Sequence, residues 1–365
     1  MKTRAAVATA KDTPFEVREV DLDSIRPDEV RVKLTASGIC HTDAIVRDQW
    51  YPMALPAILG HEGAGIIEEV GAEVVDLTVG DKVVLGPAFC GECKQCLSGH
   101  PMYCENFFAR NIGGCRPDGS KSFSDSNGEI SSNFFGQSSF AEYTNVISTG
   151  VIKVDDDAPL ELLGPLGCGI MTGSGAVLNV LRPKAGSSIA IFGTGAVGLA
   201  GMLAARAAGA TTIIMVDVVE SRLAFAEELG ATHVVNSGKT DPVAAIQEIT
   251  GGGAEFALDT TGVPAVFTQM TDCLGILGHG VLVGAAKLGD GATIDIGTRL
   301  TSGISISLVC EGDSVPKEFI PRLISLYEDG RFPFDKLTKT YALDDINTAF
   351  ADSADGSTLK PIIVY

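Results

Sequence analysis

The chain has 365 residues, which is long enough for two or three domains with sizeable hydrophobic cores. Its hydrophobic fraction of 45% is that of a globular protein, and its formal net charge of −19 makes nucleic acids and anionic membranes poor partners. The N-terminus lacks the apolar core of a signal peptide, and no apolar run is long enough to span a membrane, so we expect a cytoplasmic protein.

Short segments with β-type alternation occupy the first part of the chain, at residues 4–8, 30–34, 65–71 and 81–85. Turn-forming Pro, Gly and Asp residues separate them. These features predict a β-rich, barrel-like first domain.

Seven of the nine cysteines lie at or before Cys168. In a chain without a secretion signal, clustered cysteines favour metal-bound thiolates over disulfides. Cys40, His61 and Cys168 each stand in a glycine-punctuated segment. Two cysteines and one histidine match a catalytic zinc, which takes three protein ligands and leaves a fourth position open. The alternative is a hydrogen-bonded core histidine with two inert buried thiols.

A second group of cysteines fills the lobe 90–104 with the spacing C-x2-C-x2-C-x7-C: Cys90, Cys93, Cys96 and Cys104. Four thiolates can close a tetrahedral shell, as in structural zinc sites. An iron–sulfur cluster usually has a different last spacing and a proline after the last cysteine, so structural zinc is the better interpretation, ahead of that cluster and of a redox pair. The next segment, 107–139, is rich in Gly, Ser, Asn and Asp, and we predict a long ordered loop there.

Beyond residue 154 the pattern changes to alternating strands and helices. A strand at 188–192 runs into a glycine-rich turn and a helical stretch at 199–208, and a second strand at 211–216 ends at Asp217. The alternation recurs downstream, which predicts a doubly wound parallel sheet.

The glycine-rich turn has the form G-x-G-x-x-G, with Gly193, Gly195 and Gly198, and Asp217 lies 19 positions past its last glycine. Between a strand and a helix this is the dinucleotide-binding fingerprint. The glycines let the backbone approach a pyrophosphate, the helix N-terminus attracts it, and Asp217 can accept hydrogen bonds from a ribose. The alternative is a glycine-rich turn that holds no ligand.

The predicted fold class is α/β, with the dinucleotide-binding domain at 169–309 inserted into a catalytic domain. That catalytic domain would comprise 1–168 and a returning segment, 310–365, with a helix at 316–329 and a closing strand at 360–364.

This ordered set of motifs resembles the zinc-dependent medium-chain alcohol dehydrogenases over nearly the whole chain. Within that family the segments 40–49, 163–170 and 219–223 are most similar to the aryl-alcohol (benzyl alcohol) dehydrogenases. The resemblance implies a GroES-like catalytic domain, a Rossmann domain for NAD, and two zinc ions per chain.

The resemblance also implies roles for individual residues. Cys40, His61 and Cys168 would bind the catalytic zinc, and the four cysteines of the lobe the structural zinc. Thr42 would take the substrate proton, and Asp43 would orient His61.

Glu62 is implied as a carboxylate that approaches the catalytic zinc transiently. The residues implied to contact the dinucleotide are His41, Thr172, Gly193, Gly195, Ala196, Val197, Gly198, Asp217, Arg222 and Lys360.

The chain departs from many relatives at Ile45, where they carry a histidine that ends a proton relay. Aryl-alcohol members share this lack, so ordered water or His41 would have to complete the relay.

Gly86 stands where relatives acting on small alcohols often have a bulky aromatic residue, and Trp50 and Phe135 could form walls around a flat ring. Alternatively, Gly86 serves a turn and Trp50 packs against the barrel.

The function expected from this resemblance is reversible NAD-dependent oxidation of a primary alcohol, aromatic or allylic, to its aldehyde. Two alternatives remain, a thiol-linked (glutathione or mycothiol) formaldehyde dehydrogenase and a catalytically silent dinucleotide-binding protein. The 107–139 segment is retained as in dimeric relatives, so we expect a homodimer rather than a homotetramer.

Overall fold

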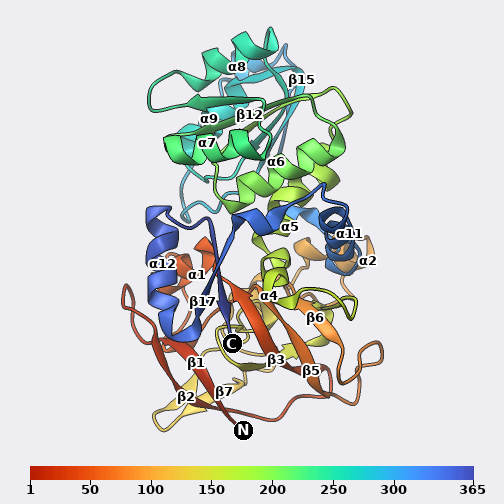
Figure 1. The fold of residues 1–365 in the computed structure, drawn as a ribbon, viewed down its shortest axis with the longest axis vertical. Coiled ribbons are helices and arrows are strands. Elements are labelled where there is room, and N and C mark those ends of the chain that lie inside the picture. Colours follow the sequence, from red (N-terminus) through yellow and green to blue (C-terminus); the bar gives the residue numbers. More distant parts are fainter. The chain divides into compact units, whose positions relative to one another are not determined.

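The computed structural model describes residues 1–365, which form two compact units (Figure 1). Unit 1 comprises Met1–Cys168, Val315–Arg322 and Asp335–Tyr365, and unit 2 comprises Gly169–Ser314 and Leu323–Phe334. Residues 310–314 and the segment Leu323–Phe334, both expected in the returning part of the catalytic domain, thus group with unit 2.

Unit 1 is built on two sheets in which most neighbouring strands are antiparallel. The five-stranded sheet has the order β4-β1-β2-β7-β8, and the seven-stranded sheet has the order β10-β6-β5-β3-β18-β17, with β9 also paired to β3. This architecture confirms the predicted β-rich, barrel-like domain. The strands are β1 (Lys2–Ala8), β2 (Glu16–Leu22), β3 (Glu29–Gly38), β4 (Ala57–Ile58), β5 (Gly63–Val70), β6 (Lys82–Leu85), β7 (Phe123–Asp125), β8 (Gly128–Ile130), β9 (Tyr143–Ile147), β10 (Val151–Lys153), β17 (Thr338–Ala342) and β18 (Lys360–Val364).

Strand β3 is central because it pairs with β5, β9 and β18. Its alternate side chains Val30, Val32 and Leu34 are buried in the core that the seven-stranded sheet covers. Two irregularities in its pairing with β5 bend the strand, as β-bulges do. Its antiparallel partner β18 sets Ile363 opposite Ser37, so the C-terminal strand shares a sheet with the N-terminal part of the chain.

The helices of unit 1 are short connections between strands. They are α1 (His41–Arg47), α2 (Lys94–Leu97), α3 (Phe107–Ile112), α4 (Leu160–Leu163) and α12 (Ile346–Asp355), and α11 (Pro316–Glu328) has residues in both units. No single helix of the protein is both long and apolar enough to cross a membrane; one bent pair, Leu160–Gly167 with Gly169–Leu181, meets that test by length and composition only.

Unit 2 is a parallel sheet with the order β13-β12-β11-β14-β15-β16. The order 3-2-1-4-5-6 is that of a doubly wound dinucleotide-binding sheet, which confirms the prediction for this half of the fold class. Its strands are β11 (Ser188–Phe192), β12 (Thr212–Asp217), β13 (His233–Asn236), β14 (Ala254–Asp259), β15 (Leu274–Leu282) and β16 (Ser305–Leu308). Its helices are α5 (Gly169–Gly175), α6 (Ala196–Ala208), α7 (Glu220–Leu229), α8 (Pro242–Thr250), α9 (Pro264–Asp272) and α10 (Ile296–Arg299).

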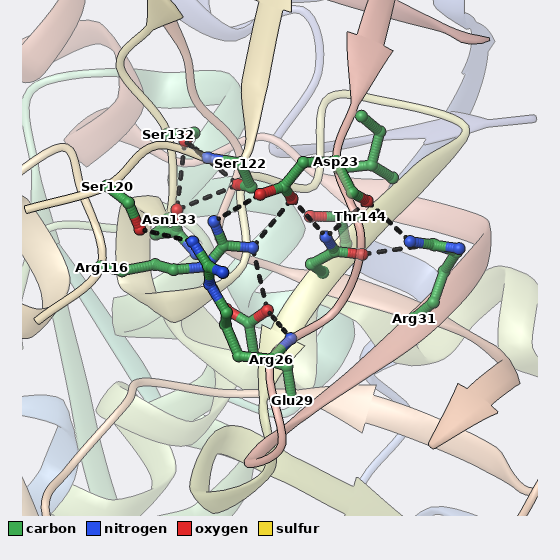
Figure 2. Close-up of polar contacts among 12 residues, drawn as sticks. Asp23, Arg26, Glu29, Arg31, Arg116, Ser120, Ser122, Ser132, Asn133 and Thr144 are labelled. Atoms are coloured by element: carbon green, nitrogen blue, oxygen red, sulfur yellow. Dashed lines mark hydrogen bonds and ion pairs between the residues drawn. The ribbon is translucent and has the colours of Figure 1, made fainter. Parts of the chain in front are cut away.

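The segment 107–139 is more regular than we predicted, because it contains α3, β7 and β8. Figure 2 shows how Arg116 ties it to the N-terminal strands. The guanidinium of Arg116, only 4% exposed, donates to Glu29 Oε1 at 2.6 Å and to both carboxylate oxygens of Asp23 at 2.9 Å. The serine and asparagine composition that suggested a loop instead supplies polar partners for one another, such as Ser122 and Ser132.

Candidate active site and cofactor site

The metal-ligating side chains predicted in unit 1 lie together. The ligand atoms of Cys40, His61, Glu62 and Cys168 all fall within 4.8 Å of one another. They come from three separate segments, just after β3, just before β5 and after α4. Glycine permits this approach, since a Cβ atom at Gly164 would stand 2.3 Å from the Glu62 carbonyl oxygen.

Asp43 fixes two of these ligands at once. Its Oδ1 accepts hydrogen bonds from His61 Nδ1 at 2.9 Å and from the backbone N–H of Gly60 at 3.0 Å. Its Oδ2 accepts from the backbone N–H of Cys40 at 2.9 Å. With Nδ1 committed to Asp43, the other ring nitrogen of His61 is buried and has no hydrogen-bond partner. That nitrogen faces the thiols as a lone-pair donor, so two thiols and an imidazole fit a catalytic zinc.

The electrostatics of the set agree with this chemistry. A hydrogen bond with Cys168 lowers the pKa of the Cys40 thiol well below its usual value, against the effect of burial. Burial alone would lower the pKa of His61, but the Asp43 carboxylate and the Cys40 sulfur raise it well above its usual value. The lowered pKa of Cys40 favours a thiolate. The raised pKa of His61 reflects negative neighbours, whose charge a divalent cation would neutralise in place of a proton.

Lys360 lies beneath this set, and Glu62 is its ionic partner. Its Nζ donates to Glu62 Oε1 and Oε2 at 2.9 Å each and to the carbonyl oxygen of Ile39 at 3.0 Å. Burial raises the pKa of Glu62, and the charge of Lys360 opposes that rise. The ammonium group implied to flank a pyrophosphate is thus 3% exposed and paired with Glu62 here.

Thr42 stands in the first turn of α1, with its hydroxyl oxygen 3.7 Å from Cys40 Sγ. Ile45, at the position of the missing relay histidine, is 2% exposed and so belongs to the core. His41 is exposed on the same helix, and its ring centroid lies 6.3 Å from that of Trp50, itself 42% exposed.

Phe135 lies against the ligand histidine. Its ring is stacked on that of His61 with centroids 4.5 Å apart, and Phe134 meets the same imidazole edge-on at 5.2 Å. Phe135 has φ of +51°, an uncommon conformation for a bulky residue, which packing on both sides maintains. At Gly86 an added Cβ atom would meet Ile152 at 3.4 Å and Pro316 at 3.7 Å, both ordinary contacts.

The second metal-ligating group is the four-cysteine lobe, in which all four sulfur atoms also lie within 4.8 Å of one another. Cys93 Sγ lies 3.5 Å and Cys90 Sγ 3.8 Å from Cys96 Sγ. Backbone N–H groups of Cys96 and Glu105 lower the pKa of Cys93 to about 6, which favours a thiolate. The donor set is four sulfurs with no fourth position left open, as in structural zinc.

The glycine-rich turn in unit 2 has the geometry of a pyrophosphate site. Gly193 has φ of +94°, and a Cβ atom at Gly198 would stand 1.9 Å from the Gly193 carbonyl oxygen. Gly195 is the N-cap of α6, and a Cβ atom there would meet nothing within 4 Å. The turn is therefore tight on its inner side and open at Gly195, next to the N–H groups of Ala196 and Val197 in the first helical turn.

Asp217 ends β12 beside this turn. Its Oδ2 accepts hydrogen bonds from the backbone N–H and the hydroxyl of Thr194, at 2.7 and 2.6 Å, and its Oδ1 accepts from the N–H groups of Val218 and Val219. Burial would raise the pKa of this carboxyl, but the hydrogen bonds from Thr194 and from the backbone lower it. Arg222, on α7, has a buried Nε without a hydrogen-bond partner.

Three residues that the sequence did not indicate also support these sites. Gln137 accepts from the N–H of Gly63 and donates to the carbonyl oxygen of His61, both at 3.0 Å. Thr194 holds Asp217, and Glu311 accepts a hydrogen bond from Thr172 at 3.0 Å. Of the three, only Thr194 could have been found from the sequence, because it lies inside the fingerprint. Gln137 and Glu311 are distant in sequence from the residues that they contact.

Comparison with known proteins gives the family. The family profile described as alcohol dehydrogenase GroES-like domain matches residues 26–156, and that described as zinc-binding dehydrogenase matches residues 196–329. A geraniol dehydrogenase of Castellaniella defragrans is 40% identical over all of this chain and 98% of its own length. An S-(hydroxymethyl)glutathione dehydrogenase of Paracoccus denitrificans is 35% identical over the full length of both.

Among solved structures, the benzyl alcohol dehydrogenase of Acinetobacter calcoaceticus is 51% identical, with a TM-score of 0.97 over all of this chain and 99% of that one. The chain belongs to the zinc-dependent alcohol dehydrogenase family, as the sequence motifs predicted. The family's cofactors, zinc and a nicotinamide dinucleotide, are therefore those of this enzyme.

Proposed function

We propose that this enzyme oxidises a primary alcohol with an aromatic or allylic neighbour to the aldehyde, reversibly and with NAD. The observation that carries the proposal is the clustered set of Cys40, His61 and Cys168, with one imidazole nitrogen unpartnered and the hydroxyl of Thr42 3.7 Å from the Cys40 sulfur. Such a set leaves one coordination position for the oxygen of a substrate.

The chain's own residues position and deprotonate the alcohol. Cys40, His61 and Cys168 would hold the metal, and Asp43 keeps the imidazole in the ligating tautomer. Thr42 Oγ1 accepts the hydroxyl proton of the alcohol and passes its own proton to ordered water or to His41, since Ile45 offers no relay. When bound, zinc would supply Lewis-acid stabilisation of the oxygen, and the nicotinamide would supply the hydride acceptor.

NAD is the preferred dinucleotide in this proposal. The carboxylate of Asp217 would accept a hydrogen bond from a free ribose 2′-hydroxyl, in place of the Thr194 hydroxyl, and would repel a 2′-phosphate. Val218 and Val219 follow it, so neither of the two residues directly after Asp217 supplies a cation that would offset the repulsion. Because the pKa of Asp217 is lowered, the carboxylate stays ionised and the NAD preference of about tenfold should persist from pH 8 down to pH 5.

The substrate class rests on the pocket residues and on the relatives. A geraniol dehydrogenase and a benzyl alcohol dehydrogenase act on alcohols whose reacting carbon adjoins an sp² carbon. Aromatic side chains near His61, and the absence of a side chain at Gly86, suit such planar groups.

Oxidation of a thiol–formaldehyde adduct is a second candidate, favoured by the 35% identity to S-(hydroxymethyl)glutathione dehydrogenase. It predicts that formaldehyde supports NADH formation only when glutathione or another thiol is added. An aromatic substrate needs no such addition.

A homodimer is the proposed assembly. Strand β16 is an edge strand of the parallel sheet, and Leu308, on that strand, is 67% exposed. Leu277 on β15 and Leu300 beside α10 are 78% and 83% exposed. Edge strands with apolar surroundings are rarely left uncovered, and a second copy can pair with the edge about a two-fold axis. Light scattering should give a molar mass of two chains for the wild type and of one chain for Leu308→Lys.

One experiment tests the activity itself. The zinc-loaded enzyme is assayed for NADH formation with benzyl alcohol, geraniol, ethanol and formaldehyde plus glutathione, with NAD and NADP side by side. We expect the highest kcat/KM with benzyl alcohol or geraniol and NAD. A preference for ethanol, or a requirement for added thiol, contradicts the proposed substrate class.

A further inference from the structure

A turn with two acidic residues lies at the carboxyl end of the parallel sheet in unit 2. It follows β16 and consists of Glu311, Gly312 and Asp313, whose φ angles are +47°, +66° and +46°. Glutamate and aspartate rarely adopt the left-handed conformation, and here two of them do so on either side of a glycine. Strained backbone of this kind gathers at functional sites, where the surrounding structure enforces it.

Helix α5 and the segment after it hold the turn in place. The hydroxyl of Thr172 donates to Glu311 Oε2 at 3.0 Å, and Asn179 Nδ2 donates to the carbonyl oxygen of Gly312 at 3.1 Å. A Cβ atom at Gly312 would stand 2.7 Å from the Cα atom of Gly175, so the two backbones are in direct contact. The side chain of Glu311 therefore has a fixed position relative to α5.

The same helix touches the dinucleotide fingerprint. A Cβ atom at Gly173, next to Thr172, would stand 1.9 Å from the carbonyl oxygen of Val197. Val197 lies in the first turn of α6, where the pyrophosphate is expected. Thr172, which binds Glu311, is thus adjacent in α5 to the residue that contacts the first turn of α6, where the pyrophosphate is expected.

The topology tells which half of the dinucleotide lies there. A dinucleotide crosses the sheet at its switch point, which here falls between β11 and β14. Asp217 marks the adenosine half on the β12 side. The nicotinamide half would then be held at the carboxyl ends of the strands on the other side of the switch point, beginning with β14, and this is the side on which Glu311 follows β16.

We propose that the carboxylate of Glu311, supported by Asp313, stabilises the oxidised nicotinamide of the bound cofactor over the reduced one. The inference rests on the proposed use of NAD. The oxidised ring is a cation and the reduced ring is neutral, whereas all other groups of the two cofactors are alike. A fixed negative charge nearby therefore favours binding of the oxidised form, and charge near the ring is a recognised means of tuning a cofactor.

Two consequences follow for the reaction. Tighter binding of the oxidised cofactor shifts the equilibrium on the enzyme towards that form, and so favours aldehyde reduction over alcohol oxidation. A tenfold preference corresponds to a reduction potential about 30 mV lower for the bound two-electron couple. The reduced cofactor also leaves more easily, which matters where product release limits turnover.

The test compares cofactor affinities of the full-length, zinc-loaded enzyme by isothermal titration calorimetry. Glu311→Gln removes the charge and keeps an oxygen that can accept from Thr172. We expect the ratio of Kd for NAD+ to Kd for NADH to rise about tenfold. Glu248→Gln, an exposed residue on α8 in the same unit, removes one charge elsewhere and should leave the ratio unchanged.

Asp313→Asn provides a second variant that does not depend on the Thr172 contact, and asparagine tolerates the left-handed conformation. It should shift the ratio in the same direction by a smaller factor. An unchanged ratio in both variants, or equal weakening of both cofactors, would overturn the proposal and leave Glu311 a support for the turn. A wild-type enzyme that binds neither NAD+ nor NADH would instead contradict the cofactor assignment beneath it.

Discussion

The two cysteine sets of unit 1 differ in how the chain assembles them. The lobe set comes from a single stretch of fifteen residues, 90–104, and of its four cysteines only Cys104 is buried. The second set joins Cys40, His61 and Cys168 from segments far apart in sequence, and both its histidine and its second cysteine are buried.

This difference has a physical consequence for metal binding. A local set has little fold around it, so the metal itself must contribute to the stability of the lobe. The dispersed set is already held by Asp43, Gln137 and the ion pair of Glu62 with Lys360. We therefore expect the fold to position the ligands of the dispersed set, and the zinc to organise the ligands of the local set.

The largest expected effect is the loss of activity in Cys168→Ser. Serine is a poor zinc ligand, and the loss of one of three protein ligands should lower turnover more than the 10–100-fold typical of residues that only orient a ligand. Because the site is preformed, the far-ultraviolet circular dichroism spectrum and the thermal midpoint should change little. Zinc analysis should give one ion per chain.

The mirror variant is Cys96→Ser in the lobe. It should also leave one zinc per chain, but it should lower the thermal midpoint and open the lobe 90–104 to limited proteolysis, while the remaining active molecules keep their kcat. If Cys168→Ser unfolds the protein as readily as Cys96→Ser, the contrast between the two sets is wrong.

Thr42→Val tests the proton transfer from the alcohol, which only the dispersed set requires. Valine keeps the shape of threonine and removes the proton acceptor, and general acid–base steps contribute about 10²–10⁴-fold. We expect a fall of that size in kcat, measured where a deuterated alcohol shows that hydride transfer limits the rate, with Kd for NAD little changed. Thr42→Ser keeps a hydroxyl and should recover most of the activity; near-normal turnover of the valine variant would remove Thr42 from the proton path.

Asp43→Asn should weaken zinc binding at the dispersed set alone. The amide cannot accept from His61, Gly60 and Cys40 together as the carboxylate does. Loss of such an orienting group typically lowers metal affinity about 10–100-fold. A chelator titration should therefore release one zinc early and leave the lobe zinc in place. Asp12→Asn, at a side chain 64% exposed, is the matched control and should release neither early.

The sequence predicted the four-cysteine lobe and the fingerprint because each depends on residue types at short, characteristic spacings. It predicted the dispersed set from the glycine-punctuated segments around Cys40, His61 and Cys168. It also predicted the parallel strands of unit 2, since buried strands such as β11 read as apolar runs. The dispersed contacts could not be predicted in this way. Nothing local in the sequence pairs Lys360 with Glu62, which lie 298 positions apart.

In the 107–139 segment the sequence-based prediction of a loop was wrong. Its polar composition suggested a loop, yet α3, β7 and β8 form there, and Arg116 anchors the segment to the buried Glu29 and to the partly exposed Asp23. The composition of a segment indicates only its average exposure to solvent. A single buried ion pair can hold a polar segment in an ordered structure that its composition does not predict. Breaking such a pair by removing one partner is costly, since the remaining charge stays buried.

The smallest effect we predict concerns the space at Gly86. The dispersed set needs room beside its metal for a substrate, whereas the four-cysteine lobe does not. A Cβ atom at Gly86 would make only ordinary contacts, at 3.4 Å with Ile152 and 3.8 Å with the carbonyl oxygen of Gly167, so Gly86→Ala should fold and serves as the control. The ring of Gly86→Phe must extend further, and if this position borders the substrate, it should reduce kcat/KM for benzyl alcohol about five- to tenfold more than for ethanol. The reason is steric, because only the aromatic substrate needs the space beside the metal. Equal losses with both alcohols, alongside an unchanged Gly86→Ala enzyme, would mean that Gly86 serves the turn before Pro87 and that another residue limits the pocket.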